Sequence, residues 1–277
     1  MSAFTGLNQI IEALTTSGEF EHIPVWIDSR AGSSVATSPI AGRLASLWTY
    51  NKSPGGEGAV PTTVAIPDNT TRGGLLQTDA GGGREKWLLG AEAASVTAGT
   101  LIVYDRLLHI GSLSGTTTTA QTVGGTLTRN TGGVGNQIWV EIYGIIGTTG
   151  TTITASYTNQ AGTSGRTSKA ASIGATNNRE VTRIIPIPLA DGDTGVQAVA
   201  SVTVLATTGT AGNFGVTIAR PLMTIPMPVS GCGTVRDLIA GLPSIRAIDT
   251  DACLALAWYA GTTTAPQIFA NFHFAEI

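Results

Sequence analysis

Few residues in this chain of 277 have the types and spacing that catalysis requires. Of the three histidines, His109 lies four residues after Asp105, on the same face of a strand if that strand is regular. A general base oriented by a carboxylate needs such a contact, but no nucleophile completes the arrangement. We therefore interpret His109 as a polar residue on a strand face or at an interface, and we expect no catalytic residue.

Two aspartate pairs and two cysteines are the candidates for metal binding. Asp191/Asp193 and Asp249/Asp251 have the close carboxylate spacing that calcium favours, but neither matches a full EF-hand loop, and Asp-Gly sequences also suit turns. Cys232 and Cys253 lack CxxC spacing and a neighbouring histidine, which gives zinc no support. We expect no metal and two buried free thiols, with a single bridge between them as the alternative.

The glycine-rich segments do not match the motifs that bind phosphate or carry a nucleophile. Residues 81–84 (Gly-Gly-Gly-Arg) lack the Gly-Lys-Ser/Thr ending and the helix that follow in a phosphate-binding loop. Residues 111–115 (Gly-Ser-Leu-Ser-Gly) have leucine where a nucleophile elbow has serine. We therefore expect no cofactor.

The composition indicates a folded chain with an unusually uncharged surface. Hydrophobic residues make up 42%, whereas charged residues make up 12%, about half the usual ~25%. Few charges are expected where partners cover the surface, although Thr and Ser can also solvate it. The net charge of −3, with no basic run, argues against direct nucleic-acid binding. No apolar run reaches the ~18 residues of a membrane helix, and the first residues do not resemble a signal peptide, so we expect assembly in a cytoplasm.

The first 95 residues predict a short helix followed by an extended arm. Phe4, Leu7, Ile10, Ile11 and Leu14 share one helical face, which must dock on this domain or on a neighbour. Prolines and glycine pairs then interrupt residues 21–95 and argue against central strands there, although residues 23–27 read as a strand. Scattered aromatic residues predict an ordered arm laid along a surface, or, alternatively, a segment that wraps its own domain.

Residues 96–277 predict an all-β domain. Strand patterns recur at residues 101–110, 136–146, 153–157, 181–189, 196–205, 214–220 and 268–274, separated by Gly/Thr turns. Such spacing is typical of an antiparallel β-sandwich, and we favour a jelly-roll-like one. A capping pattern at Thr234–Asp237, followed by Leu238 and Ile239, predicts one short helix within this region.

Several segments resemble stretches of tailed-bacteriophage virion proteins. These are residues 81–87 (GGGREKW), 101–107 (LIVYDRL), 137–143 (QIWVEIY), 154–162 (TASYTNQAG) and 207–216 (TTGTAGNFGV). Within that group the chain is most similar to head decoration, or cement, proteins, and the likeness covers roughly residues 70–225.

This resemblance implies a non-enzymatic jelly-roll subunit, commonly trimeric, that sits on the outer capsid surface of the virion. Its partners would be the major capsid protein or other virion proteins and further copies of itself. A neck, tail or fibre-base subunit and a receptor- or carbohydrate-binding module are the alternatives. The candidate interface residues are Leu7, Ile10 and Ile11 of the predicted helix and Trp48, Tyr50, Trp87 and Leu88 of the arm; core positions are the alternative for the tryptophans.

Overall fold

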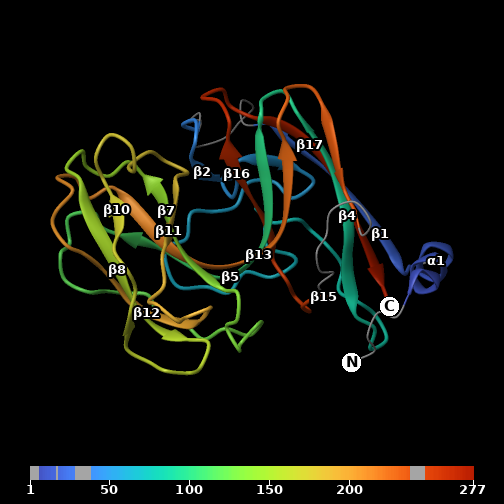
Figure 1. Ribbon diagram of the computed structural model, residues 1–277, viewed down its shortest axis with the longest axis horizontal. Helices are drawn as coiled ribbons and strands as arrows, with labels where there is room; N and C mark the ends of the chain where they lie inside the picture. The colour runs from blue at the N-terminus through green and yellow to red at the C-terminus, as the bar shows by residue number, and fades with distance from the viewer. Residues whose placement is uncertain (1–5, 17, 29–38, 238–246) are drawn as a thin grey trace.

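The computed structural model describes residues 6–16, 18–28, 39–237 and 247–277 of the chain. It confirms an all-β fold of antiparallel sheets packed as sandwich-like layers, with one short helix, α1 (Leu7–Thr15), near the N-terminus. Figure 1 shows two bodies of sheet joined by long strands, with α1 on the outside of the right-hand body.

The sheet nearest α1, here the proximal sheet, has the strand order β14-β4-β17-β1-β3. Its strands are β14 (Gly233–Arg236), β4 (Lys86–Ser95), β17 (Gln267–Glu276), β1 (Phe20–Asp28) and β3 (Asn51–Ser53), and β15 (Ala247–Ile248) also pairs with β4. Strand β1 pairs with β17 along its whole length, from Phe20↔Ala275 to Asp28↔Gln267. Pro24 is tolerated in β1 because β3 pairs only with residues 26–28, which leaves that edge open at Pro24.

The shared sheet has the order β11-β7-β13-β5-β16-β2 and supports both bodies. It comprises β11 (Ile184–Ile187), β7 (Gln137–Gly144), β13 (Asn213–Met227), β5 (Gly99–Leu113), β16 (Leu254–Ala260) and β2 (Leu44–Ser46). The distal sheet, β10-β8-β12-β6, comprises β10 (Ala171–Ile173), β8 (Thr151–Asn159), β12 (Val196–Val204) and β6 (Gln121–Thr122), with β9 (Arg166–Thr167) paired to β8.

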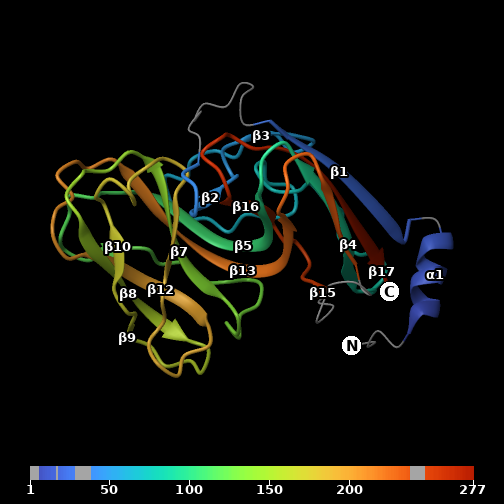
Figure 2. The same ribbon diagram turned by 45° about the horizontal axis from the view of Figure 1, so that its top comes forward.

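Two apolar cores lie on the shared sheet. One core joins Leu101 and Val103 of β5 to the proximal sheet, and the other joins Leu107 and Leu108 of the same strand to the distal sheet. Strands β5 and β13 have 15 residues each and run through both cores. Figure 2 shows both strands curving from one body into the other, so the two sandwiches are built on common strands.

The structure also places two segments that the sequence pattern did not foresee as strands. Strand β4 lies inside the proximal sheet, between β14 and β17, although its residues fall within the predicted arm. The helix predicted from Thr234 is wrong, because residues 233–236 form β14, paired to Ala91–Ala94 of β4. An available strand edge and the β-branched residues Thr234 and Val235 outweigh the local capping pattern there; Leu238 and Ile239 lie outside the described residues.

Candidate interaction surface

The sharpest concentration of polar side chains surrounds Arg106 in β5, inside the molecule. Arg106 and Glu141 are both fully buried and form a two-pronged ion pair, with Nη1–Oε1 at 2.7 Å and Nη2–Oε2 at 2.9 Å. The hydroxyl groups of Tyr104 and Tyr143 accept further hydrogen bonds from the guanidinium. The Trp48 ring lies 4.4 Å from the guanidinium carbon. All of these partners satisfy one another, which makes this a closed structural network.

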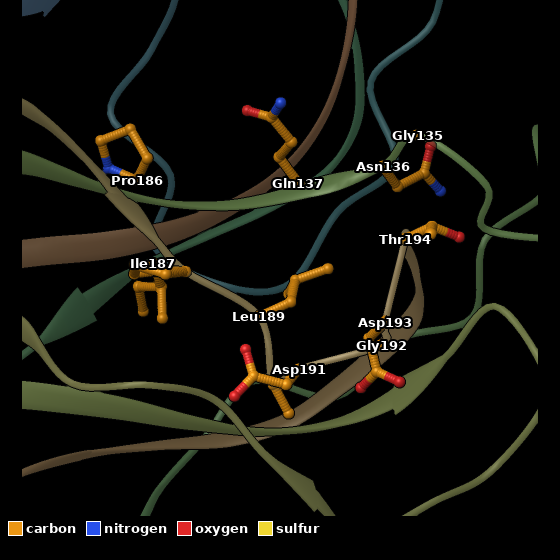
Figure 3. Close-up of a pocket in the computed structure, with 12 residues that line it drawn as sticks. Gly135, Asn136, Gln137, Pro186, Ile187, Leu189, Asp191, Gly192, Asp193 and Thr194 are labelled. Atoms are coloured by element: carbon orange, nitrogen blue, oxygen red, sulfur yellow. The ribbon is translucent and has the colours of Figure 1, made fainter.

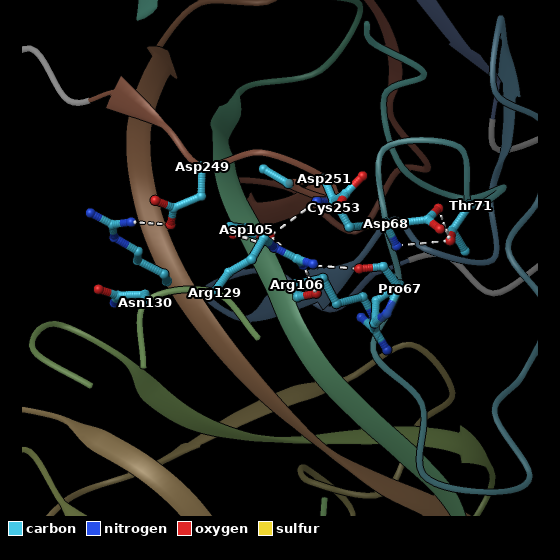
Figure 4. A network of polar contacts seen from close by, with 12 residues as sticks. Pro67, Asp68, Thr71, Asp105, Arg106, Arg129, Asn130, Asp249, Asp251 and Cys253 are labelled. Carbon is cyan, nitrogen blue, oxygen red and sulfur yellow. Dashed lines mark hydrogen bonds and ion pairs between the residues drawn. The ribbon is translucent and has the colours of Figure 1, made fainter. Parts of the chain in front are cut away.

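Asp105 and His109, which the sequence analysis considered together, are bound by two different arginines. Arg129 binds Asp105 at 3.0 Å, and the Pro67 carbonyl also accepts from Arg129 (Figure 4). His109 instead accepts a hydrogen bond from Arg106 Nε at 2.8 Å. Burial, and then the positive charge of Arg106, lower the pKa of His109 to about 2, so the imidazole is neutral across the ordinary pH range. Asp105 lies in β5 between Val103, which belongs to one apolar core, and Leu107, which belongs to the other.

Lys52 is a third buried charge site, which sequence spacing could not reveal. Its ammonium donates to the carbonyl groups of Leu47, Trp48 and Tyr50, and its side chain is buried. Burial lowers the pKa of Lys52 to about 7, while the Glu57 carboxylate acts in the opposite direction. With three carbonyl acceptors, this lysine of β3 fixes the segment that joins β2 to β3.

Asp191 and Asp193, in the loop after β11, line an open hollow of about 590 Å³ together with Gln137, Pro186 and Leu189 (Figure 3). The Asp193 carboxylate already accepts from Tyr157, from Asn159 Nδ2 at 2.8 Å and from Arg166 Nε at 2.9 Å. Hydrogen bonds from Tyr157 and Asn159 lower the pKa of Asp193 to about 2. Both carboxylate oxygens of Asp193 therefore accept hydrogen bonds from β8 and β9, which hold the loop that contains Asp193 in place.

The second aspartate pair is also divided. Arg220 Nη1 binds Asp249 Oδ2 at 2.9 Å, whereas the backbone N–H of Asp251 donates to Asp79 Oδ1 at 2.8 Å. In the parts of the chain that the structure describes, no three His, Cys, Asp or Glu residues are arranged to hold a metal ion. Both cysteines are free, but Cys232 is exposed, which corrects the expectation that it is buried. Burial raises the pKa of the Cys253 thiol to about 12.

Helix α1 uses only part of its apolar arc to bind its own chain. Ala13 is buried against Leu89 and Ala275, and Ile10 packs at the edge of this small cluster. Leu7 and Ile11 remain 59% and 57% exposed, and Leu14 is exposed as well. At 3.6 residues per turn, these three positions form one stripe beside the docked face.

The open end of the proximal sheet is the second exposed apolar surface; we define it as Trp26, Ala94, Val96, Val235 and Phe269. Trp26 and Phe269 are directly paired across β1 and β17, and their rings lie 5.9 Å apart. Two shallow hollows, of about 220 and 230 Å³, share Ala94 and Phe269 and extend to Val235 and Val96. This surface is therefore contiguous. The sequence analysis did not identify these residues as an interface. Its one relevant signal was the alternation along residues 268–274, which places Phe269 on the opposite face of the strand from Ile268 and Ala270.

The structure separates the candidate interface residues into three groups. Trp48, Tyr50 and Leu88 are buried within their own chain. Ile10 of α1 and Trp87 of β4 are half-buried where α1 packs on the proximal sheet. Leu7 and Ile11 are exposed and can contact a partner without rearrangement.

No family model matches this sequence, and neither does any curated protein. Among solved structures, the crystal structure of the infectious bursal disease virus VP2 subviral particle is similar at 9% identity, with a TM-score of 0.17. That alignment covers 93% of this chain and 80% of the VP2 chain. No described helix has the length and apolar character needed to cross a membrane.

Proposed function

We propose that this protein is a non-enzymatic structural subunit of a tailed-bacteriophage particle, which decorates the capsid and stabilises it by bridging neighbouring capsomers. The observation that carries an assembly role is the pair of exposed apolar surfaces on one side of the proximal sheet. Soluble monomers seldom expose large contiguous apolar patches, and such patches mark interaction sites. The virion setting comes from the resemblance of residues 70–225 to phage virion proteins.

The contacts of the buried polar residues also support a structural role. Arg106, Glu141, Asp105 and Arg129 are buried and satisfy one another. Their contacts hold the shared sheet to the segments that cover it, which suits a subunit that must keep its shape under load. A bridging subunit adds buried apolar area on both sides of a seam, and several copies together bind far more tightly than one.

The test is sedimentation of purified full-length protein, alone and mixed with empty phage capsids. We expect an oligomer, a trimer in the decoration reading, that co-sediments with capsids at a fixed ratio of copies per capsomer. A protein that ignores capsids but forms a ring-sized oligomer would contradict decoration and favour the neck or tail alternative. If apolar contacts dominate, mild detergent should reduce co-sedimentation, whereas raising the salt concentration should change it little, because salt weakens contacts between charges.

A further inference from the structure

The two exposed apolar surfaces lie on the same outer face of the proximal sheet, at opposite ends. Helix α1 packs over Leu89 and Ala275, whereas the open end is centred on Phe269. Ala275 lies six positions after Phe269 in β17, which corresponds to about 20 Å at ~3.3 Å per strand residue. Figures 1 and 2 both show α1 at one end of β1 and β17, with the other end of those strands left uncovered by helix.

We infer that the open end of the proximal sheet is the docking site for the exposed stripe of α1 from a second copy of this chain. The inference builds on the proposed assembly role and names the partner of this surface. The chain itself provides the precedent, because the same sheet face already accepts apolar side chains of α1 at its covered end.

The two surfaces match in chemistry. The stripe consists of Leu7, Ile11 and Leu14, and the open end of four apolar side chains and Ala94. The residues of the stripe and of the open end carry no charge, and the neighbouring Glu92, which lines one hollow at the rim, accepts a hydrogen bond from Asn271 Nδ2 at 2.6 Å. Burying uncharged apolar surface on both sides avoids the cost of an unpaired charge.

The area is what a stable contact between copies requires. The large apolar side chains of the two surfaces are each 40–59% exposed; they are Leu7, Ile11, Leu14, Trp26, Val96, Val235 and Phe269. Together they offer on the order of 800 Å² in each copy, which is about what one partner contributes to a standard-size interface. Neither surface alone approaches that area, so both would have to be used in each copy.

Symmetry allows each copy to use both surfaces. If two copies face each other and their strands run in opposite directions, the α1 end of each sheet lies over the open end of the other. The contact is then made twice around a two-fold axis, and the assembly closes. A ring of three, in which each helix docks on the next copy, would use the same contact and agree with a trimer.

The middle of this face is polar and would lie at the centre of a two-fold pair. His22 and His273 stack there with their rings 5.0 Å apart. Directly paired on β1 and β17, they lie between the covered and open ends of the sheet. Their polar atoms would fix the register of the two copies, while the apolar ends supply the buried area.

The test uses light-scattering mass measurements on the full chain and on charge variants. Ile11→Glu and Phe269→Lys should each weaken association at least tenfold, because each places a charge in the contact. Leu205→Glu is the matched control, since Leu205 is exposed directly after β12 of the distal sheet. Melting curves followed by circular dichroism verify that each variant is folded.

Mixing the two single variants makes the test specific. An Ile11→Glu helix on a Phe269→Lys sheet forms a Glu–Lys pair, and the reciprocal contact is wild type, so the mixture should regain association. A monomeric wild-type protein at 100 µM, or folded variants that associate like the wild type, would overturn the inference. A third outcome separates the inference from the proposed function. If the variants lose association but the wild type does not bind capsids, the docking inference is supported and the proposed function is contradicted.

Discussion

At the residue scale, the buried Arg106–Glu141 ion pair determines how much a substitution at the centre of the shared sheet destabilises the fold. Because both side chains are fully buried, removing one leaves the other as an uncompensated buried charge. We expect Arg106→Met to lower the free energy of unfolding by about 3–5 kcal/mol. The double variant Arg106→Met/Glu141→Leu should lose less than that single variant, because no charge remains buried. Urea unfolding followed by tryptophan fluorescence measures both, and strictly additive losses would contradict this explanation.

His109 makes the stability of the fold depend on pH. Its pKa is about 2 in the folded protein, against about 6.5 when unfolded, so the folded state excludes a proton that the unfolded state binds. The stability from neutral His109 is therefore complete above pH 6.5 and is lost as the pH falls towards 2. From pH 6.5 to 5 the loss should be about 2 kcal/mol, at ~1.4 kcal/mol per unit.

The variant His109→Gln isolates this contribution, because a glutamine oxygen can still accept from Arg106 Nε and does not titrate. Urea midpoints at pH 7 and pH 5 should differ less in the variant than in the wild type. Equal differences would show that carboxylates alone produce the pH dependence.

At the element scale, α1 depends on its docking site. A helix of nine residues is marginal in isolation, and its stability comes from packing. Ala13→Asp should therefore release α1 from Leu89 and Ala275 and expose the first residues to protease, while the melting temperature of the sheets changes little. Asn8→Asp, at an exposed position of the same helix, is the control. Equal protease resistance in both variants would show that α1 does not rely on the Ala13 contact.

The elements also show what local pattern can predict. Residues 153–157 and 268–274 alternate apolar and polar side chains, and both are strands in the structure. Strand β4 escaped prediction because its Lys-Trp-Leu-Leu-Gly-Ala-Glu-Ala-Ala-Ser sequence lacks that alternation. It is a strand because both its neighbours, β14 and β17, pair with it.

The candidate site was less predictable than the fold, because it depends on register. Arg106 and Glu141 are 35 residues apart, and only the pairing of β5, β13 and β7 brings them together. The open end of the proximal sheet likewise combines residues from β1, β4, β14 and β17. Trp48 and Tyr50 were predicted at an interface but are buried in their own chain. Aromatic residues in a Gly/Pro-rich segment are compatible with either location, so the sequence alone could not distinguish the two.

At the scale of the whole molecule, the two sandwiches should unfold as one unit because β5 and β13 are part of both cores. Ile153→Ala removes a buried side chain from the distal core only, at a cost of about 2–5 kcal/mol. If the shared strands couple the cores, hydrogen exchange should become faster in β17 and β1 of the proximal sheet as well as in β8 and β12. Leu205→Ala, an exposed substitution, should change neither. Faster exchange confined to β8 and β12 would mean that the distal sandwich opens alone, and that a load applied to one body of the subunit is not carried into the other.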